Sequence, residues 1–288
     1  MRTETFQTPG PVRAEVRIGA GEVRFEATET GETTVTLEPL RDNDATRAAI
    51  EDARVELRER SGGYDVVVDV RDHGRGFSFG RGAEVRVELR CPEGTEIETK
   101  TGSADIDGRG PFGSISVQTG SGDVHFDEVT GNVRVDAASG DVDVPTVGGD
   151  ARINTASGDV QLGSISGASK VNSASGDVSV REARGSVDVN SASGDVFVGE
   201  ASSSVSVNTA SGDQQIQRAG QGKLSLKSAS GDLQVGIPQG TTLFVDARSR
   251  SGEVRSELPV SDSAPEGNGP NIELRANTMS GDITVVRA

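Results

Sequence analysis

The chain has 288 residues, of which 45 are acidic and 29 are basic, so its net charge is −16. It contains 38 glycines, one tyrosine and no tryptophan, and aromatic residues make up only 3% of it. So few large side chains exclude a single thick core and leave two outcomes, disorder or a thin core of small residues that repeats along the chain. The negative charge argues against nucleic acids and anionic membranes as partners, because both repel an anion.

Residues that build covalent or metal frameworks are scarce. Cys91 is the single cysteine, which excludes an intrachain disulfide framework. The two histidines, His73 and His125, leave little for a histidine-based metal centre, and no motif predicts a cofactor. No apolar run has the length of a membrane span, and the polar segment 1–10 lacks the apolar core of a secretory signal. These features predict a cytoplasmic location.

Residues 1–100 are predicted to form a less regular β region, continuous with the repeats that follow. Alternation at 16–18 and 23–25, around a corner that contains two glycines, predicts two short strands. The same pattern predicts further strands at 33–37, 54–58, 64–70 and 83–89. One short helix is predicted at 44–52, with its N-cap among residues 42–44.

A glycine-rich segment at 73–82 contains two arginines and two phenylalanines within an otherwise acidic chain. A flexible hairpin tip accounts for the glycines. Basic and aromatic side chains also suit a partner-binding loop, and the candidate contact residues are then Arg75, Phe77, Phe79 and Arg81. The segment lacks the spacing of a phosphate-binding loop, which excludes a nucleotide site of that kind.

The tripeptide Ser-Gly-Asp recurs every 18 residues from Ser121 to Ser211. It returns at Ser230, as Ser-Gly-Glu at Ser251, and at Ser280. A fixed period near 20 residues indicates a solenoid.

Apolar residues fall at positions 1, 3, 6, 10, 12 and 15 after the aspartate, so each period holds two Val-x-Val strands and two glycine corners. Position 15, as at Ala138 and Ala156, is expected to face the interior. The pattern contains no 3.6-residue stripe and excludes a helix. It predicts an all-β fold, a single-stranded parallel β-solenoid over 101–288, with two short strands per rung and rungs stacked about 4.8 Å apart. Equal positions then form columns, in which each valine is buried against its own copies.

Two polar columns follow from this register. One contains Asn154, Asn172, Asn190 and Asn208, whose stacked amides are predicted to form a ladder in which each side chain donates to the next. The other contains the aspartates of the tripeptide. They either cap backbone N–H groups in the turn or, because stacked carboxylates repel, bind divalent cations. The candidate metal ligands are Asp123, Asp141, Asp159, Asp177, Asp195 and Asp213.

The C-terminal part is less regular. Residues 256–270 contain three of the ten prolines, which predicts an exposed loop inserted in one rung. The last strand, after Ser280, is expected to form the terminal rung with an open β edge. Such an edge permits an end-to-end homodimer, and simple capping is the alternative.

The repeated Asn-Ser/Thr-Ala-Ser-Gly-Asp-Val unit, together with the Pro-Gly-Pro-Val-Arg-Ala-Glu-Val-Arg-Ile-Gly-Ala-Gly-Glu segment of residues 9–22, resembles the bacterial DUF4097 family of β-strand-repeat proteins, also labelled putative adhesins. The resemblance covers essentially the whole chain. It implies a β-solenoid of unknown molecular function and brings no catalytic residues with it. The adhesin label implies surface exposure, although the sequence shows neither a signal nor an anchor.

These observations favour a non-enzymatic structural or protein-interaction module, a rigid rod that offers flat acidic faces to a protein partner. A calcium-binding repeat protein is the alternative, although calcium-binding β-rolls have two glycines where this chain has one. A β-helix enzyme acting on polysaccharides is less favoured, because the carboxylates lie in uniform columns rather than in a cluster. Phe197 is the only aromatic residue expected at an outward strand position within the strict repeats.

Overall fold

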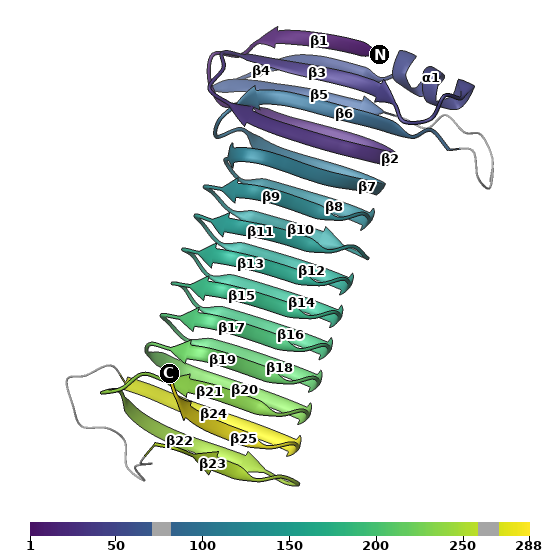
Figure 1. The fold of residues 1–288 in the computed structure, drawn as a ribbon. Coiled ribbons are helices and arrows are strands. Elements are labelled where there is room, and N and C mark those ends of the chain that lie inside the picture. The colour runs from purple at the N-terminus through teal and green to yellow at the C-terminus, as the bar shows by residue number, and fades with distance from the viewer. Residues whose placement is uncertain (71–81, 259–270) are drawn as a thin grey trace. The chain divides into compact units, whose positions relative to one another are not determined.

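The computed structural model describes residues 1–70, 82–258 and 271–288 (Figure 1). The chain divides into two compact units, Met1–Thr146 and Val147–Ala288. The first unit contains α1 (Asp44–Glu51) and the strands β1 (Arg2–Gln7), β2 (Arg13–Thr28), β3 (Glu32–Pro39), β4 (Arg54–Arg60), β5 (Gly63–Val70), β6 (Val85–Pro92), β7 (Glu96–Phe112), β8 (Ile115–Ser121), β9 (Val124–Val129), β10 (Val133–Ala137) and β11 (Val142–Val147), the last of which ends at the boundary.

The second unit consists of short strands in pairs, one pair per rung. They are β12 (Ala151–Ser157), β13 (Val160–Ile165), β14 (Ser169–Ser175), β15 (Val178–Ala183), β16 (Val187–Ser193), β17 (Val196–Ala201), β18 (Val205–Ser211), β19 (Gln214–Ala219), β20 (Gly222–Ser230), β21 (Leu233–Ile237), β22 (Thr242–Ser249), β23 (Val254–Ser256), β24 (Asn271–Ser280) and β25 (Ile283–Arg287).

The strand β2 is bent and forms a whole rung by itself. Its first half pairs in parallel with β5 and β7, and its second half pairs in parallel with β6 and β7. The two strands predicted at 16–18 and 23–25 are the two halves of β2. The other strands predicted in this region correspond to β3, β4, β5 and β6.

The N-terminal strands depart from the parallel arrangement predicted for the repeats. β1 pairs with β3, β3 with β6, and β4 with β5, all antiparallel. The connection from β4 to β5 shows why, because only Ser61 and Gly62 separate the two strands. Two residues can reverse the chain but cannot carry it around a full rung, and Gly62 supplies the positive φ (98°) of this tight turn.

The predicted helix is present as α1. Its N-cap is Asn43, within the predicted range, and the Asn43 side chain accepts the N–H of Thr46 at 2.7 Å. The helix buries Thr46, Ala49 and Ile50. After its last turn, the Arg2 guanidinium donates to the carbonyl of Ala53 at 2.6 Å, so β1 and the end of the helix are held together.

The core of the first unit contains large side chains that the regular repeats lack. Phe25, Phe112 and Phe126 pack with ring centroids 5.4–6.3 Å apart. Gly108 makes room for them, because a Cβ there would lie 2.2 Å from the Phe126 ring. Cys91, in β6, is fully buried, and burial raises the pKa of its thiol to about 12.

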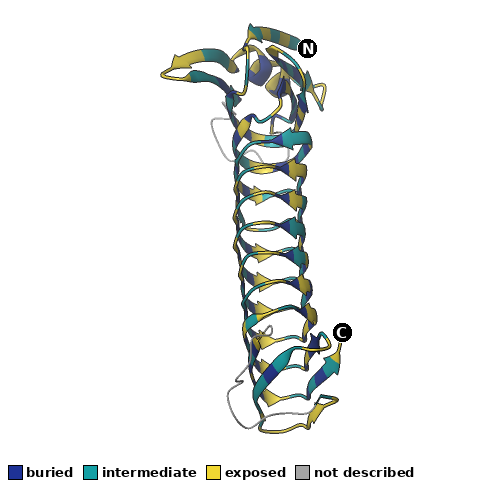
Figure 2. Cartoon of the chain, turned by 90° about the vertical axis from the view of Figure 1, so that its left-hand side faces the viewer, coloured by how far each residue is buried: buried dark blue, intermediate teal, exposed yellow. Residues whose placement is uncertain are grey.

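The regular rungs of the second unit have the predicted 18-residue register. Equivalent strands pair in parallel, so that Ile153 lies beside Val171 and Val189 beside Val207. These four side chains are at most 1% exposed. Buried and exposed residues alternate along each strand (Figure 2). The predicted parallel β-solenoid with two short strands per rung is therefore confirmed.

The two glycine corners of a rung have different requirements. Gly176, at the Ser-Gly-Asp corner, has a φ of 111°, and a Cβ there would lie 2.2 Å from the carbonyl oxygen of Gly158. At the opposite corner, a Cβ on Gly185 would lie 2.1 Å from the carbonyl oxygen of Gly167. The first corner needs glycine for its positive φ and because the backbone of the neighbouring rung lies close to it. The second corner needs glycine because of the close backbone.

The expectation that position 15 after the aspartate faces the interior is wrong. Ala138 and Ala156 are exposed, and before Ala156 the buried residue is Thr155. The strand alternation continues for one more inward residue before the corner begins. A hydroxyl can be buried there because it donates to the carbonyl two residues on, 2.9 Å from Thr155 to Ser157, and the same bond recurs at Ser173 and Ser191.

The expectation that the last strand forms the terminal rung is also wrong. β24 lies between β20 and β22, and β25 lies between β21 and β23, all parallel. A central rung is covered on both sides, and Leu274 and Ile283 accordingly have no exposed surface. The rung of β22 and β23 occupies the outer place, where Val254 is 48% exposed. The order of the rungs in space therefore differs from their order along the chain.

Replacing Val171 with aspartate tests the register. Val171 is fully buried, so an unpaired carboxylate at this position should lower the free energy of unfolding by about 3–5 kcal/mol. The control is Ser179→Asp, whose side chain faces outward, and it should be close to neutral. Thermal melting followed by circular dichroism measures both. Equal melting temperatures for the two variants would contradict the register.

Candidate interaction surfaces

The aspartate column of the second unit is a ladder of side-chain to backbone hydrogen bonds. The N–H of Asp177 donates to Oδ1 of Asp159 at 2.8 Å, and equal bonds connect Asp195 and Asp213 in turn. The ladder continues in spatial order through the displaced rung: the N–H of Asp282 donates to Asp232, and the N–H of Glu253 donates to Asp282. In the first unit, Asp123 and Asp141 donate in the same way to the aspartate 18 residues before each of them.

These bonds show that the column caps backbone N–H groups at the corner, one of its two predicted roles. The six candidate metal ligands all lie in the column and are all exposed. Among the described residues, no group of three or more Asp, Glu, His or Cys side chains is placed to hold a metal ion. Cation binding by the column stays a prediction from sequence.

The other predicted site residues, Arg75, Phe77, Phe79 and Arg81, lie outside the described residues. Their role in partner binding also stays a prediction.

The asparagine column forms the predicted amide ladder. Nδ2 of Asn172 donates to Oδ1 of Asn154 at 2.8 Å, Asn190 donates to Asn172 at 3.2 Å, and Asn208 donates to Asn190 at 3.1 Å. The ladder lies on the outward side of the sheet of β12, β14, β16 and β18. Its amides bond along the stack, which fixes the side chains on this sheet.

The opposite sheet of the second unit, β13, β15, β17 and β19, carries an aromatic residue in a polar column. Pairing places four outward residues side by side, and we call them the Phe197 column: Gln161, Ser179, Phe197 and Gln215. Phe197 is half-buried between two smaller polar neighbours. Glu182 and Glu200 are paired on the same sheet, and Arg184 and Arg218 lie beside them, so charges of both signs flank the column.

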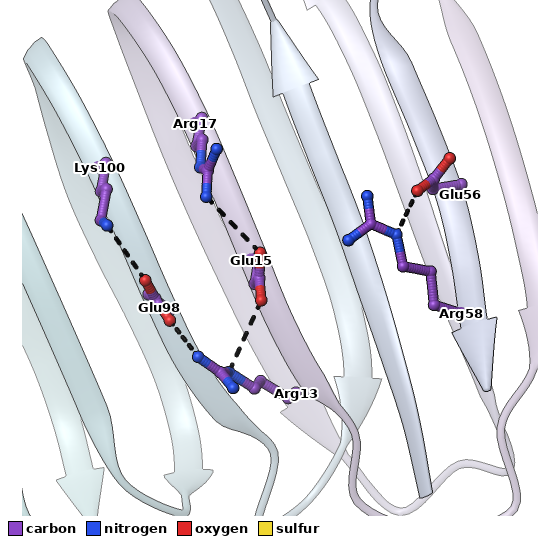
Figure 3. A network of polar contacts seen from close by, with 7 residues as sticks. All are labelled: Arg13, Glu15, Arg17, Glu56, Arg58, Glu98 and Lys100. Atoms are coloured by element: carbon purple, nitrogen blue, oxygen red, sulfur yellow. Dashed lines mark hydrogen bonds and ion pairs between the residues drawn. The ribbon is translucent and has the colours of Figure 1, made fainter. Parts of the chain in front are cut away.

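The first unit carries a network of ion pairs on the sheet of β2 and β7 (Figure 3). Arg13 lies between two carboxylates, bonding Glu98 and approaching Glu15 at 3.9 Å, and Lys100 approaches Glu98 at 3.3 Å. The hydrogen bond from Arg13 holds the pKa of Glu98 below its ordinary value, and the same bond raises the pKa of Arg13. Arg58 bonds Glu56 in the same way on β4. Sequence reasoning missed this network, although its alternating Arg and Glu residues are visible in the strands.

A shallow pocket of about 480 Å³ opens on the other sheet of the first unit. Its charged lining consists of three arginines and three carboxylates, Arg24, Arg90, Arg109, Glu26, Glu88 and Asp107. A second pocket beside it includes His125, whose ring nitrogens lie 3.1 Å from Asp127 and 3.0 Å from Asp143. Because opposite charges balance within the lining of the first pocket, it has no net charge with which to attract an ion.

Residues 15–217 and 183–286 match the model of the Toastrack DUF4097 family. The chain belongs to this family. The resemblance that the repeat unit suggested is thereby confirmed, and so is the β-solenoid fold of this Toastrack chain. No curated protein sequence matches it.

Several crystal structures are similar to this Toastrack chain. One is a putative lipid binding protein from Parabacteroides distasonis, with 17% identity, a TM-score of 0.48 and coverage of 99% of this chain and 96% of that one. A putative adhesin from Bacteroides fragilis has 12% identity, a TM-score of 0.40 and the same coverage. A putative cell adhesion protein from Clostridium sporogenes has 11% identity and a TM-score of 0.23, with 100% and 99% covered.

Within the described ranges, none of the helical structure is long and apolar enough to cross a membrane.

The capping role of the aspartate column can be separated from its charge. Asp177→Ala removes the acceptor for the Asp195 N–H and should lower the free energy of unfolding by about 1 kcal/mol. Asp177→Asn removes the charge but keeps an oxygen that can accept, so it should melt close to the unchanged protein. If capping is the only role of the column, adding calcium or a chelator leaves the melting temperature unchanged. If calcium instead raises the melting temperature, and raises it less in both variants, the result would support a cation site.

Acidification should destabilise the first unit through Glu98. A carboxylate whose pKa is lowered on folding stabilises the protein above its unfolded pKa, and this contribution is lost as the pH falls through the folded pKa. The free energy of unfolding should therefore decrease between about pH 5 and pH 3, and less steeply in Glu98→Gln. Denaturant unfolding at a series of pH values measures this. Glu29→Gln, at an exposed turn, is the control and should retain the full slope.

Proposed function

We propose that this Toastrack chain is a non-enzymatic protein-interaction module and that the Phe197 column is its contact surface. The observation that carries the proposal is the position of Phe197, a half-buried aromatic residue on the outward side of an in-register sheet. Aromatic side chains are enriched among the residues that dominate binding energy at protein interfaces. Glutamine and serine around the ring would form the polar part of such an interface.

The rigidity of the sheet supports this role. The strands on both sides of β17 are hydrogen bonded to it along their length, and the corners are fixed by the aspartate ladder. A surface that is already ordered loses little conformational entropy when a partner binds. The unit therefore offers a preformed binding face.

The charge of the surface defines the chemistry of the partner. The glutamates near the Phe197 column are accompanied by arginines, but the chain as a whole has a net charge of −16. A partner with an apolar pocket surrounded by lysine or arginine would be complementary in shape and charge, and long-range attraction would accelerate its association. Nucleic acids and anionic membranes are repelled by the same field.

The location of the protein stays a prediction from sequence. A cytoplasmic chain would present this face to other cytoplasmic proteins, and the adhesin label of the family would instead place the face outside the cell. The proposed contact surface is the same in both cases.

Replacing Phe197 with serine should abolish capture of the partner. The immobilised full chain is exposed to an extract of the source cell, and the retained proteins are identified by mass spectrometry. Loss of a central aromatic contact costs about 2 kcal/mol or more, which is roughly a 30-fold loss of affinity. Lys170→Ser, on the opposite sheet, is the control and should retain the same proteins as the unchanged chain.

Two outcomes would contradict the proposal. One is that the chain retains no protein specifically. The other is that the unchanged chain and the Phe197→Ser variant, both folded by circular dichroism, retain the same proteins.

A further inference from the structure

In the part of the chain that the structure describes, the outer rung of the second unit has a strand edge without a partner strand. β22 pairs with β24 and β23 pairs with β25, and in the described part of the chain neither has a strand on its other side. Alternate N–H and C=O groups of β22 therefore point away from the sheet, where they can pair with another strand. This edge is eight residues long in β22, whereas β23 has only three residues.

The interior residues of this rung are less covered than those of the next. Leu274 and Ala276 of β24 have no exposed surface, but their neighbours Val245 and Ala247 in β22 are half-buried. Val254, in β23, is 48% exposed. A further strand along β22 would bury the apolar surface of Val245 and Ala247 as well as satisfy the backbone.

The charges on β22 indicate which strand fits. Asp246 and Arg248 lie on its outward face, two residues apart, with Nε of Arg248 3.1 Å from Oδ1 of Asp246. If a second β22 lies antiparallel with its centre at Ala247, Asp246 is opposite Arg248 of the partner subunit. The two-fold symmetry repeats this pair, so both copies of each charge have an opposite charge across the edge.

The same charges disfavour the two adjacent registers. Centring the antiparallel pair on residue 246 places Asp246 opposite the partner's Asp246. Centring it on residue 248 places Arg248 opposite the partner's Arg248. Like charges directly opposite each other destabilise a strand pair. The sequence of β22 is therefore complementary to itself in the register centred on Ala247.

We propose that two copies of this chain form a dimer by antiparallel pairing of their β22 edges, centred on Ala247. The interface is isologous, so it closes at two copies and does not propagate into a fibre. It involves neither Phe197 nor its sheet, so it does not depend on the proposed function.

Sedimentation velocity on the full chain tests the proposal over a range of concentrations. The unchanged chain should sediment with twice the mass of the 29.8 kDa monomer. Arg248→Asp and Asp246→Arg each place like charges across the edge and should each give a monomer. The double variant exchanges the two charges, restores opposite charges across the edge, and should be a dimer again.

Arg184→Asp is the matched control. Arg184 is also an exposed arginine that pairs with a carboxylate two residues before it, Glu182, but it lies away from β22. It should leave the dimer intact, and so should Phe197→Ser. Circular dichroism confirms that each variant is folded. A monomeric unchanged chain would overturn the proposal, and so would a dimer that persists in both single variants or a double variant that stays monomeric.

Discussion

Parallel pairing between successive rungs is the interaction on which the rest of this structure depends. A rung of two short strands has no internal partner for its backbone, so each N–H and C=O group must bond to the rung on either side. Such pairing brings the same position of every rung into one column. Val171 can then be buried by Ile153 and Val189 although no thick core exists. The backbone ladder thus turns a chain with few large side chains into a stable fold.

The same constraint determines how polar groups are satisfied at the corners. Where the chain bends between strands, backbone groups leave the ladder and need other partners. The carboxylate of Asp177 accepts the N–H of Asp195, and the hydroxyl of Ser173 donates to the carbonyl of Ser175. One polar side chain is on the outside of the corner and the other is inside. Their recurrence explains why Ser, Thr, Gly and Asp are the most regular part of each repeat.

The order of the rungs in space differs from their order in the chain. The rung of β24 and β25 fits between two others because Leu274 and Ile283 can be covered from both sides. The aspartate ladder passes through it without interruption, from Asp232 to Asp282 to Glu253. An outer rung, by contrast, can tolerate the exposed Val254. The columns therefore follow the order of the rungs in space, and the flat faces that they create are the surfaces available for binding.

The sequence by itself determined the period, the parallel solenoid, the glycine corners and the asparagine ladder, because each follows from identical residues spaced 18 apart. It also placed the strands near Val16 and Val23 and the helix that begins at Asp44. It could not decide the side of Ala156, because only the local bend shows that Thr155 is the last inward residue. Nor could it decide the place of the last rung, since residues 222–237 present equivalent columns to either following rung. Only the tertiary structure, in which the rung of β24 and β25 is covered on both sides, decided the order.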